Sequence, residues 1–360
     1  MILLLTTNLA RGGAETQVAQ LAIGLAARGW DVSVASMLPP SAFQEELAAA
    51  GVRVFPLGMK PGVPNPVGLV RLAALLRELR PAVLHCHMFH ANLLGRLARL
   101  IAPVPTVVST AHSIVESSRA SESARGRELL YRITDWLADT TVCVCEAGAK
   151  RYAGTHAAPR RKLKVIPNGV DTARFRPDSE MRAQTRKRLA IGDEFVWLAA
   201  GRLMWKKDYP TMLRAFTALQ NGLLLIAGEG PQELESGANV RLLGPRHDIP
   251  ELMNAADACV LSSVVEGLPM ALLEAASSAL PCVATDVGGV AEIVRDPACL
   301  VPPGDAAALQ KAMLRVMELP PEQRRAMGQA NREHAVARFD MNAVIGQWER
   351  LYDQLARASC

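Results

Sequence analysis

The sequence has few aromatic residues and little excess charge. Phenylalanine, tryptophan and tyrosine make up only 4% of the 360 residues, while half of the chain is hydrophobic. This aliphatic composition favours α/β layers over an aromatic-rich β-sandwich, and it argues against disorder. A formal net charge of +5 is too small to mark a nucleic-acid-binding protein, so we expect no nucleic acid among the partners.

Three further signals are missing. The seven cysteines include no C-x-x-C pair, and their odd number argues against a disulfide framework. The first residues lack a basic segment, and their apolar run is too short for a signal peptide. No run of 18 uncharged apolar residues occurs, so no transmembrane helix is expected. We therefore expect a cytoplasmic protein.

The positive charge is confined to the first half. Residues 1–167 hold 19 lysines and arginines against 11 aspartates and glutamates, whereas the remainder holds 21 against 24. Such asymmetry indicates an anionic partner or surface for the first half. Ordinary solvated surface charge is the alternative.

Short apolar runs alternate with amphipathic segments along the chain. In the first half they predict buried strands at 2–7, 31–36, 52–55, 82–86, 106–110 and 141–145. In the second half they predict strands at 195–200, 223–227, 240–243, 258–261 and 282–285. Helices are predicted there at 208–219, 268–278, 290–294 and 306–318. Strands separated by helices form parallel, doubly wound sheets, so the fold class is α/β.

The length corresponds to two domains of average size. A strand that ends in Pro and Gly at 164–169 predicts the boundary between domains at 1–167 and 168–340. The last segment, 341–360, contains an amphipathic helix that we expect to pack back on the first domain. Two doubly wound domains bind a ligand in the cleft between them, at the carboxyl ends of their strands.

The strongest motif is a pair of glutamates eight residues apart, Glu266 and Glu274, in the segment EGLPMALLE. Pro269 between them suits the first turn of a helix. The backbone N–H groups at that helix start, which can bind a phosphate, belong to Gly267, Leu268 and Met270. Glu274 could accept hydrogen bonds from ribose hydroxyls. A surface glutamate pair around a core helix is the alternative.

This segment resembles the E-x7-E motif of the retaining glycosyltransferases of family 4, which have the GT-B fold. Four other segments resemble elements of that family in the same order: GGAE at 12–15, NGVD at 168–171, GRL at 201–203 with a lysine pair at 206–207, and GEGP at 228–231. The resemblance extends from residue 1 to about residue 340. It implies a GT-B enzyme whose first domain binds an acceptor and whose second binds a nucleoside-diphosphate sugar.

The resemblance also implies roles for matching residues. Arg202 and Lys207 would neutralise the diphosphate, and the family spacing selects Lys207 over the adjacent Lys206. Glu266 would hold a hydroxyl of the transferred sugar and stabilise oxocarbenium character, while Glu274 would hold the ribose. The other donor-binding residues are expected to be Gly12, Gly13, Gly228, Arg246, Ile249, Gly267, Leu268, Pro269 and Met270.

Departing diphosphate charge must be stabilised by a metal ion or by fixed cations. A metal-dependent site would be expected to carry paired aspartates such as D-x-D, and the sequence contains no D-x-D. Two cations with helix N–H groups can replace the metal, so we expect a metal-independent enzyme without a required cofactor. The segment HCHMFH, with His85, His87 and His90, superficially suggests a metal site, but no carboxylate or cysteine pair accompanies it.

His112 follows the predicted strand 106–110. The resemblance places it beside the anomeric carbon of the donor sugar, in a catalytic position, although a histidine after a strand is often structural. His87, Phe89 and Ser113 are the candidate acceptor-binding residues.

These observations predict a retaining glycosyltransferase. It would use a UDP-linked donor such as UDP-GlcNAc or UDP-GalNAc and act on a lipid-linked or cell-surface glycan precursor. The alternatives are a GT-B nucleotide-sugar epimerase or hydrolase, and a catalytically silent sugar-nucleotide-binding subunit of a glycan assembly complex. The basic first half leaves open a peripheral contact with anionic lipid on the inner face of the cytoplasmic membrane.

Overall fold

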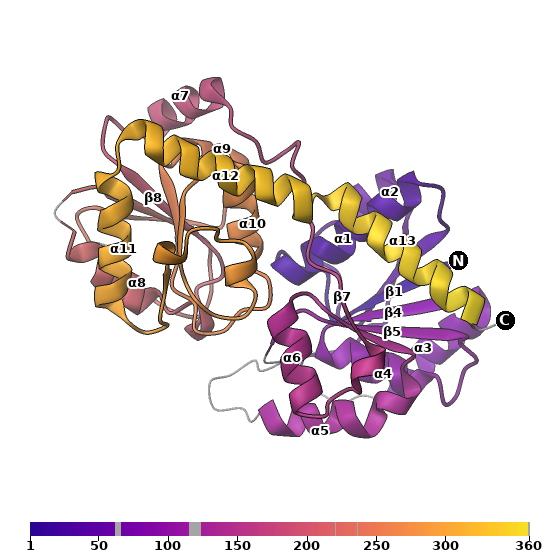
Figure 1. The fold of residues 1–360 in the computed structure, drawn as a ribbon. Coiled ribbons are helices and arrows are strands. Elements are labelled where there is room, and N and C mark those ends of the chain that lie inside the picture. The colour runs from indigo at the N-terminus through magenta and orange to yellow at the C-terminus, as the bar shows by residue number, and fades with distance from the viewer. Residues whose placement is uncertain (62–65, 115–123, 220, 236, 359–360) are drawn as a thin grey trace. The chain divides into compact units, whose positions relative to one another are not determined.

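A computed structural model of the chain describes all residues except 62–65, 115–123, 220, 236 and 359–360 (Figure 1). The chain divides into two compact units. Unit 1 comprises Met1–Asn168 and Asn342–Cys360, and unit 2 comprises Gly169–Met341. Each unit is built on one sheet whose paired strands are all parallel, which confirms the predicted α/β class with two Rossmann-like domains.

The sheet of unit 1 has the strand order β3-β2-β1-β4-β5-β6-β7. Its strands are β1 (Ile2–Thr6), β2 (Val32–Ser36), β3 (Arg53–Pro56), β4 (Val83–His87), β5 (Thr106–Ala111), β6 (Thr140–Cys143) and β7 (Leu163–Val165). Its helices are α1 (Gly13–Ala27), α2 (Gln44–Ala49), α3 (Pro66–Leu79), α4 (Phe89–Ala98), α5 (Ala124–Thr134), α6 (Glu146–Gly154) and α13 (Met341–Ala358), with short 3-10 turns η1 (Asp135–Leu137) and η2 (Arg160–Lys162). The strand order reverses between β1 and β4, and parallel α/β sheets bind ligands at such a switch point.

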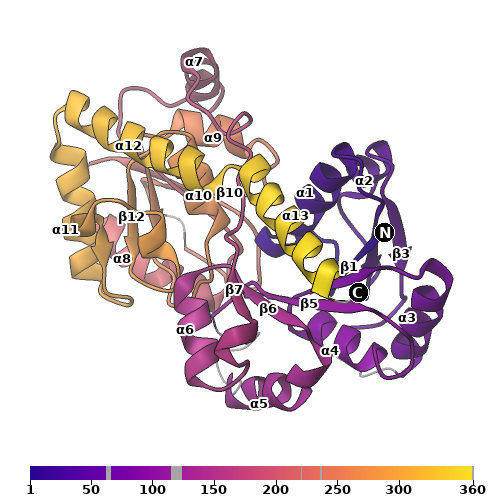
Figure 2. The same ribbon diagram turned by 45° about the vertical axis from the view of Figure 1, so that its right-hand side comes forward.

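Helices cover both faces of this sheet. Figure 1 shows α1, α2 and α13 on one face and α3, α4 and α5 on the other, and Figure 2 shows α13 against the same strands from a second direction. Glu349 anchors α13, because it pairs with Arg28 at 2.6 Å and accepts a hydrogen bond from Trp30 Nε1 at 2.8 Å. The C-terminal helix therefore packs back on the first domain, as predicted.

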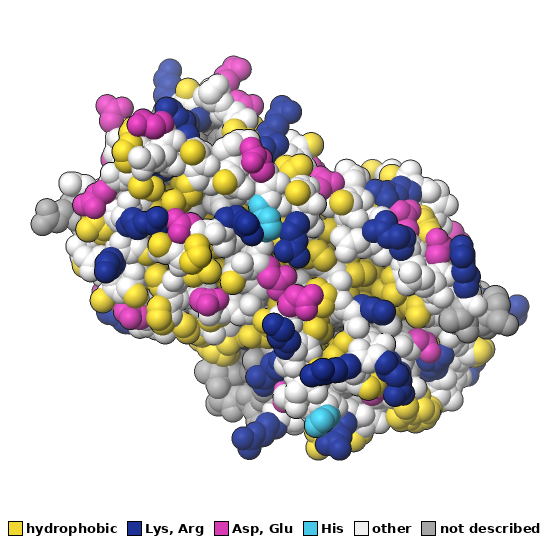
Figure 3. All heavy atoms as spheres, in the orientation of Figure 1, with side chains coloured by type: hydrophobic (Ala, Val, Ile, Leu, Met, Phe, Trp, Pro, Cys, Tyr) yellow, Lys and Arg dark blue, Asp and Glu magenta, His cyan; other side chains and the backbone are white. Residues whose placement is uncertain are grey.

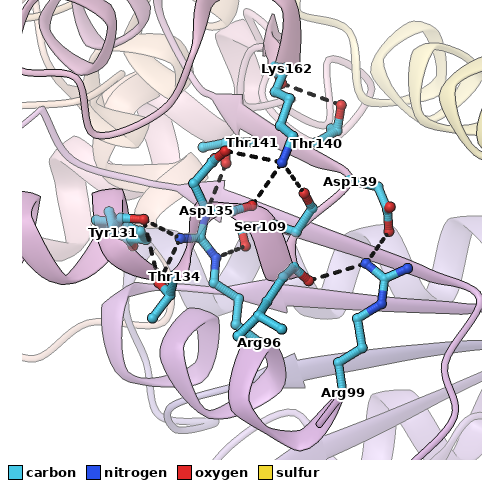
Figure 4. A network of polar contacts seen from close by, with 12 residues as sticks. Arg96, Arg99, Ser109, Tyr131, Thr134, Asp135, Asp139, Thr140, Thr141 and Lys162 are labelled. Carbon is cyan, nitrogen blue, oxygen red and sulfur yellow. Dashed lines mark hydrogen bonds and ion pairs between the residues drawn. The ribbon is translucent and has the colours of Figure 1, made fainter.

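A buried cation joins four elements of unit 1 (Figure 4). The side chain of Arg96, on α4, is fully buried. It donates hydrogen bonds of 3.1 Å to the hydroxyls of Ser109, Thr134 and Thr141 and to the carbonyl oxygen of Tyr131. These partners come from β5, β6 and α5, so one guanidinium ties the helix layer to the sheet.

The sheet of unit 2 has the order β10-β9-β8-β11-β12-β13. Its strands are β8 (Val196–Ala200), β9 (Leu223–Ala227), β10 (Val240–Gly244), β11 (Ala258–Leu261), β12 (Cys282–Thr285) and β13 (Leu300–Val301). Its helices are α7 (Ser179–Arg188), α8 (Tyr209–Thr217), α9 (Ile249–Ala255), α10 (Met270–Ser277), α11 (Ala306–Glu318) and α12 (Pro321–Phe339), with η3 (Trp205–Lys207), η4 (Val290–Glu292) and η5 (Pro297–Cys299). The switch point of this sheet lies between β8 and β11. None of the described helices is long and apolar enough to cross a bilayer.

Candidate active site

The loops after β8 and β11 meet at the switch point of the unit 2 sheet. Lys207 ends η3, which follows β8, and Glu266 lies in the loop after β11. Lys207 Nζ is 2.6 Å from Glu266 Oε1, and Ser263 Oγ donates to the same oxygen at 2.6 Å. The side chains of Lys207 and Glu266 are only 18% and 13% exposed. The structure thus brings together two of the predicted residues and adds Ser263, which sequence reasoning missed although it follows a predicted strand.

Two glycines allow the surrounding loops to approach one another. Gly228 has φ +152°, and a Cβ there would lie 1.9 Å from the carbonyl oxygen of Gly201. Gly288 has φ +60°, and a Cβ there would lie 2.3 Å from the carbonyl oxygen of Glu266. L-residues with a side chain rarely adopt such angles. A larger residue at either position would displace the loops that carry Lys207 and Glu266.

Arg202 lies just beyond β8 and points to solvent. Its side chain is exposed, and the described part of the chain gives it no ion pair or hydrogen bond. Lys207 is bound to Glu266, whereas Arg202 is exposed. The loop after β8 therefore offers one cation paired with a carboxylate and one exposed cation for an anionic ligand.

Glu274 lies in the second turn of α10, a helix that begins at Met270 directly after Pro269. Burial raises the pKa of the Glu274 carboxyl to about 7, and the charge of Arg174 acts in the opposite direction. A carboxyl with this pKa changes its ionisation near neutral pH. The preceding segment, with Gly267 and Leu268, leads from Glu266 into the helix, so both glutamates of the motif belong to one loop-and-helix element.

Arg246 and Ile249 lie between β10 and α9. The Arg246 guanidinium forms two hydrogen bonds with Asp248, at 2.8 and 2.5 Å, and Arg188 binds the same carboxylate at 2.7 Å. The hydrogen bond from Arg246 lowers the pKa of Asp248. Ile249 is the first residue of α9. Arg246 is therefore fixed on its own loop, and its side chain is already occupied.

In unit 1, Gly12 and Gly13 form the start of α1 after β1. Gly12 has extended backbone, and a Cβ there would lie 2.4 Å from Glu15 Oε2. The Glu15 carboxyl, on a side chain that is 7% exposed, thus occupies the space over Gly12. Gly12 thus makes room for the Glu15 carboxyl, which a side chain at this position would displace.

His87, which is buried, and His112, which is half-buried, form a pair at the ends of adjacent strands. His87 is the last residue of β4, and His112 follows β5. His87 Nδ1 lies 3.1 Å from His112 Nε2, and the other nitrogens, His87 Nε2 and His112 Nδ1, are buried without a partner in the described chain. Burial lowers the pKa of His112 to about 4 and lowers that of His87 well below its usual value. Both rings are therefore neutral at pH 7.

Phe89, a further predicted acceptor residue, is 6% exposed and packs against Tyr131 and Ala111 in a hydrophobic core cluster. Ser113 is partly exposed beside His112. Within the residues that the structure describes, no group of three metal-ligating side chains converges.

Two sequence profiles match the chain. The profile of Glycosyltransferase Family 4 matches residues 11–174, and that of Glycosyl transferases group 1 matches residues 194–318. A D-inositol 3-phosphate glycosyltransferase of Saccharomonospora viridis is 30% identical over 393 residues, which span 96% of this chain and 88% of that enzyme. The chain belongs to glycosyltransferase family 4. The predicted family and enzyme class are thereby confirmed.

Further relatives of this glycosyltransferase support the same family and fold. The UDP-Gal:alpha-D-GlcNAc-diphosphoundecaprenol alpha-1,3-galactosyltransferase of Escherichia coli is 31% identical over 244 residues, which span 61% of this chain and less than two thirds, 62%, of that enzyme. Anabaena HepE in complex with UDP-glucose superposes with a TM-score of 0.85 at 21% identity, covering 98% of this chain and 99% of HepE. Thermosynechococcus elongatus sucrose-phosphate synthase superposes with a TM-score of 0.84 at 22% sequence identity, covering 99% of each chain. These structures establish the GT-B fold.

Proposed function

We propose that the enzyme transfers a sugar from a UDP-linked donor, such as UDP-GlcNAc or UDP-GalNAc, with retention of anomeric configuration. The acceptor is a lipid-linked or cell-surface glycan precursor. The UDP donor is supported by HepE, solved with UDP-glucose, and by the galactosyltransferase named for UDP-Gal. The lipid-linked acceptor is supported by the diphosphoundecaprenol in that same name. Unit 2 takes the donor, and unit 1 takes the acceptor.

The observation that carries this proposal is the Lys207–Glu266 pair at the switch point of the unit 2 sheet. In the absence of ligand the two charges neutralise each other. When a diphosphate binds, Lys207 and Arg202 balance its charge, and Glu266 is released to hold a hydroxyl of the transferred sugar and to stabilise the oxocarbenium-like state. Glu274 holds the ribose.

The remaining donor contacts come from backbone groups. Gly228 follows β9 directly, and Gly12 and Gly13 lie at the start of α1, where we expect the diphosphate. The residues that lead into helices α9 and α10 complete the set: Arg246, Ile249, Gly267, Leu268, Pro269 and Met270.

His112 hydrogen-bonds a hydroxyl of the transferred sugar from unit 1. His87 and Ser113 lie beside it and contribute to the acceptor side. The departing diphosphate oxygen takes the proton of the acceptor hydroxyl on the face that it leaves. The new glycosidic bond then forms on that face, and no separate general base is needed.

The test combines donor binding with product analysis. Thermal shift with a panel of UDP- and GDP-sugars should show stabilisation by a UDP-sugar, and NMR of the product formed with undecaprenyl-diphosphate GlcNAc should show a retained anomeric configuration. Stabilisation by GDP-sugars alone would overturn the proposed donor. A changed sugar without acceptor would indicate an epimerase or hydrolase, and binding without any turnover would indicate a silent subunit.

We also propose that unit 1 contacts an anionic membrane through an α4–α5 surface, defined as Leu97, Leu100, Ile101, Leu129, Leu130, Ile133 and Trp136. These seven side chains are 39% to 68% exposed. Figure 3 shows Lys and Arg side chains gathered over the part of this face that carries α5 and α6. Exposed apolar side chains beside cations suit the interface of an anionic bilayer.

A further inference from the structure

The histidine pair is connected to the C-terminal helix through a third histidine. The hydroxyl of Tyr352, on α13, lies 2.7 Å from His85 Nδ1, and His85 Nε2 lies 2.7 Å from Thr110 Oγ1. The ring centroid of His85 is 3.9 Å from that of His87, which in turn bonds to His112. A continuous row therefore runs from α13 to the carboxyl ends of β4 and β5.

The two ends of this row differ. Both ring nitrogens of His85 are bonded, whereas His87 Nε2 and His112 Nδ1 have no partner in the described chain although they are buried. Buried polar atoms are normally paired. Two open nitrogens next to the switch point of the sheet indicate that a ligand completes them.

The chemistry of a neutral histidine pair defines what these nitrogens offer. One proton is shared between His87 Nδ1 and His112 Nε2. If His87 carries it, His87 Nε2 is an acceptor and His112 Nδ1 is a donor; if His112 carries it, the two roles are exchanged. In both states the pair presents one donor and one acceptor. The two open nitrogens lie at opposite ends of the pair, because the bond joins the facing nitrogens of rings whose centroids are 5.4 Å apart. A hydroxyl of a sugar can donate or accept, so it can bond to His112 Nδ1 in either state.

We propose that Tyr352 is a positioning residue for the transfer reaction: through His85 it holds the His87–His112 pair so that His112 Nδ1 meets a hydroxyl of the sugar. This inference rests on the proposed function, in which His112 contacts the transferred sugar. The helix is itself held in place. The centroid of the Trp348 ring lies 4.5 Å from that of the His85 ring. The adjacent residue of α13, Glu349, pairs with Arg28.

The test is Tyr352→Phe, which removes the hydroxyl and keeps the ring that packs on Trp30 and Trp348. We expect kcat to fall about tenfold, with the donor KM within about twofold, because the loss concerns orientation and not binding. Nitrogen NMR of the histidine side chains should show that His87 and His112 no longer keep one fixed proton arrangement. Unchanged kcat and unchanged histidine signals would overturn the inference.

Tyr131→Phe is the matched control. Tyr131 is also a buried tyrosine of unit 1, and its hydroxyl accepts a hydrogen bond from Asn92 outside the row. We expect Tyr131→Phe to lower Tm by about as much as Tyr352→Phe does, but to leave kcat unchanged. A fall in kcat for Tyr352→Phe alone then separates positioning from stability. If Tyr352→Phe does not fold, His85→Asn breaks the same link and is measured in its place.

His112→Ala separates this inference from the proposed function. If His112→Ala keeps normal turnover, the proposed contact with the sugar is wrong, and the histidine signals of Tyr352→Phe still decide whether Tyr352 holds the pair. If His112→Ala loses turnover while Tyr352→Phe changes neither kcat nor the signals, only the inference about Tyr352 fails.

Discussion

Lys206 and Lys207 are adjacent in sequence but have different surroundings. Lys207 Nζ is 2.6 Å from Glu266, whereas Lys206 Nζ lies over the Trp205 ring, 5.8 Å from its centroid. We expect Lys207→Ala to lower kcat/KM with the UDP-sugar about 10²- to 10³-fold, because a cation near the departing diphosphate is lost. Steady-state kinetics should show Lys206→Ala within about threefold of the native enzyme. Equal losses in the two variants would contradict the assignment of Lys207.

The ionisation of Glu274 predicts how donor affinity depends on pH. Its pKa is raised to about 7 by burial, so the carboxylate, which can accept bonds from two ribose hydroxyls, is lost as the pH falls below 7. Titration calorimetry with a UDP-sugar, whose diphosphate does not titrate between pH 5.5 and 8.5, should show affinity falling by up to about tenfold per unit below pH 7. Glu274→Gln should bind more weakly and without this slope. The same slope in both proteins would exclude Glu274 as its source.

Spacing and resemblance select Glu266, Glu274 and Lys207, but they do not give the contacts that these residues make. The Lys207–Glu266 contact joins residues 59 positions apart, and it exists because β8 and β11 are neighbours in the sheet. The Tyr352–His85 contact spans 267 positions. Such contacts follow from strand order and helix packing, which local sequence patterns do not contain.

At the scale of elements, two arginines at the C-terminal end of α4, Arg96 and Arg99, differ in burial (Figure 4). Arg96 is fully buried and bonds to four oxygens. The side chain of Arg99 is 24% exposed; it pairs with Asp139 and donates to the carbonyl oxygens of Leu137 and Pro105. We expect Arg96→Met to lower the free energy of unfolding by about 2–4 kcal/mol, because buried oxygens of three elements lose their donor. Arg99→Met should cost about 1 kcal/mol or less. Urea unfolding measures the free energy of unfolding of both variants. Equal losses would show that the buried network of Arg96 stabilises the fold no more than the partly exposed contacts of Arg99.

The strands of both sheets were largely predictable, and some helices were not. β9, β11, β12 and α11 have the predicted bounds, because each is a short apolar run or a clear amphipathic pattern between turn residues. The helix expected over 290–294 is instead the 3-10 turn η4. α7 was missed, since only Thr185 of its ten residues is buried and no apolar stripe marks it. Arg182 and Arg186 on α7 bond to Asp257, so polar contacts fix this helix in place of an apolar face.

At the scale of the whole molecule, the uneven charge of the sequence leads to a test of the α4–α5 surface. The excess of basic residues lies in residues 1–167, and the α4–α5 surface adds seven exposed apolar side chains to the same unit. If this surface meets a membrane, the protein should sediment with vesicles containing phosphatidylglycerol and not with neutral vesicles. Binding should weaken with added salt, because the lipid attraction is screened.

Matched substitutions locate the contact. Ile133→Ser with Trp136→Ser should reduce vesicle binding about tenfold or more, since the apolar anchors are removed. Leu314→Ser with Val336→Ser removes side chains of unit 2 that are 40% and 41% exposed, and it should leave binding unchanged. Turnover of a short water-soluble acceptor should be equal in all three proteins, because the substitutions lie outside the proposed donor and acceptor residues. Equal vesicle binding by both variants would place the membrane contact elsewhere. If the native protein does not bind vesicles even at low salt, the basic residues of unit 1 would serve a different anionic partner.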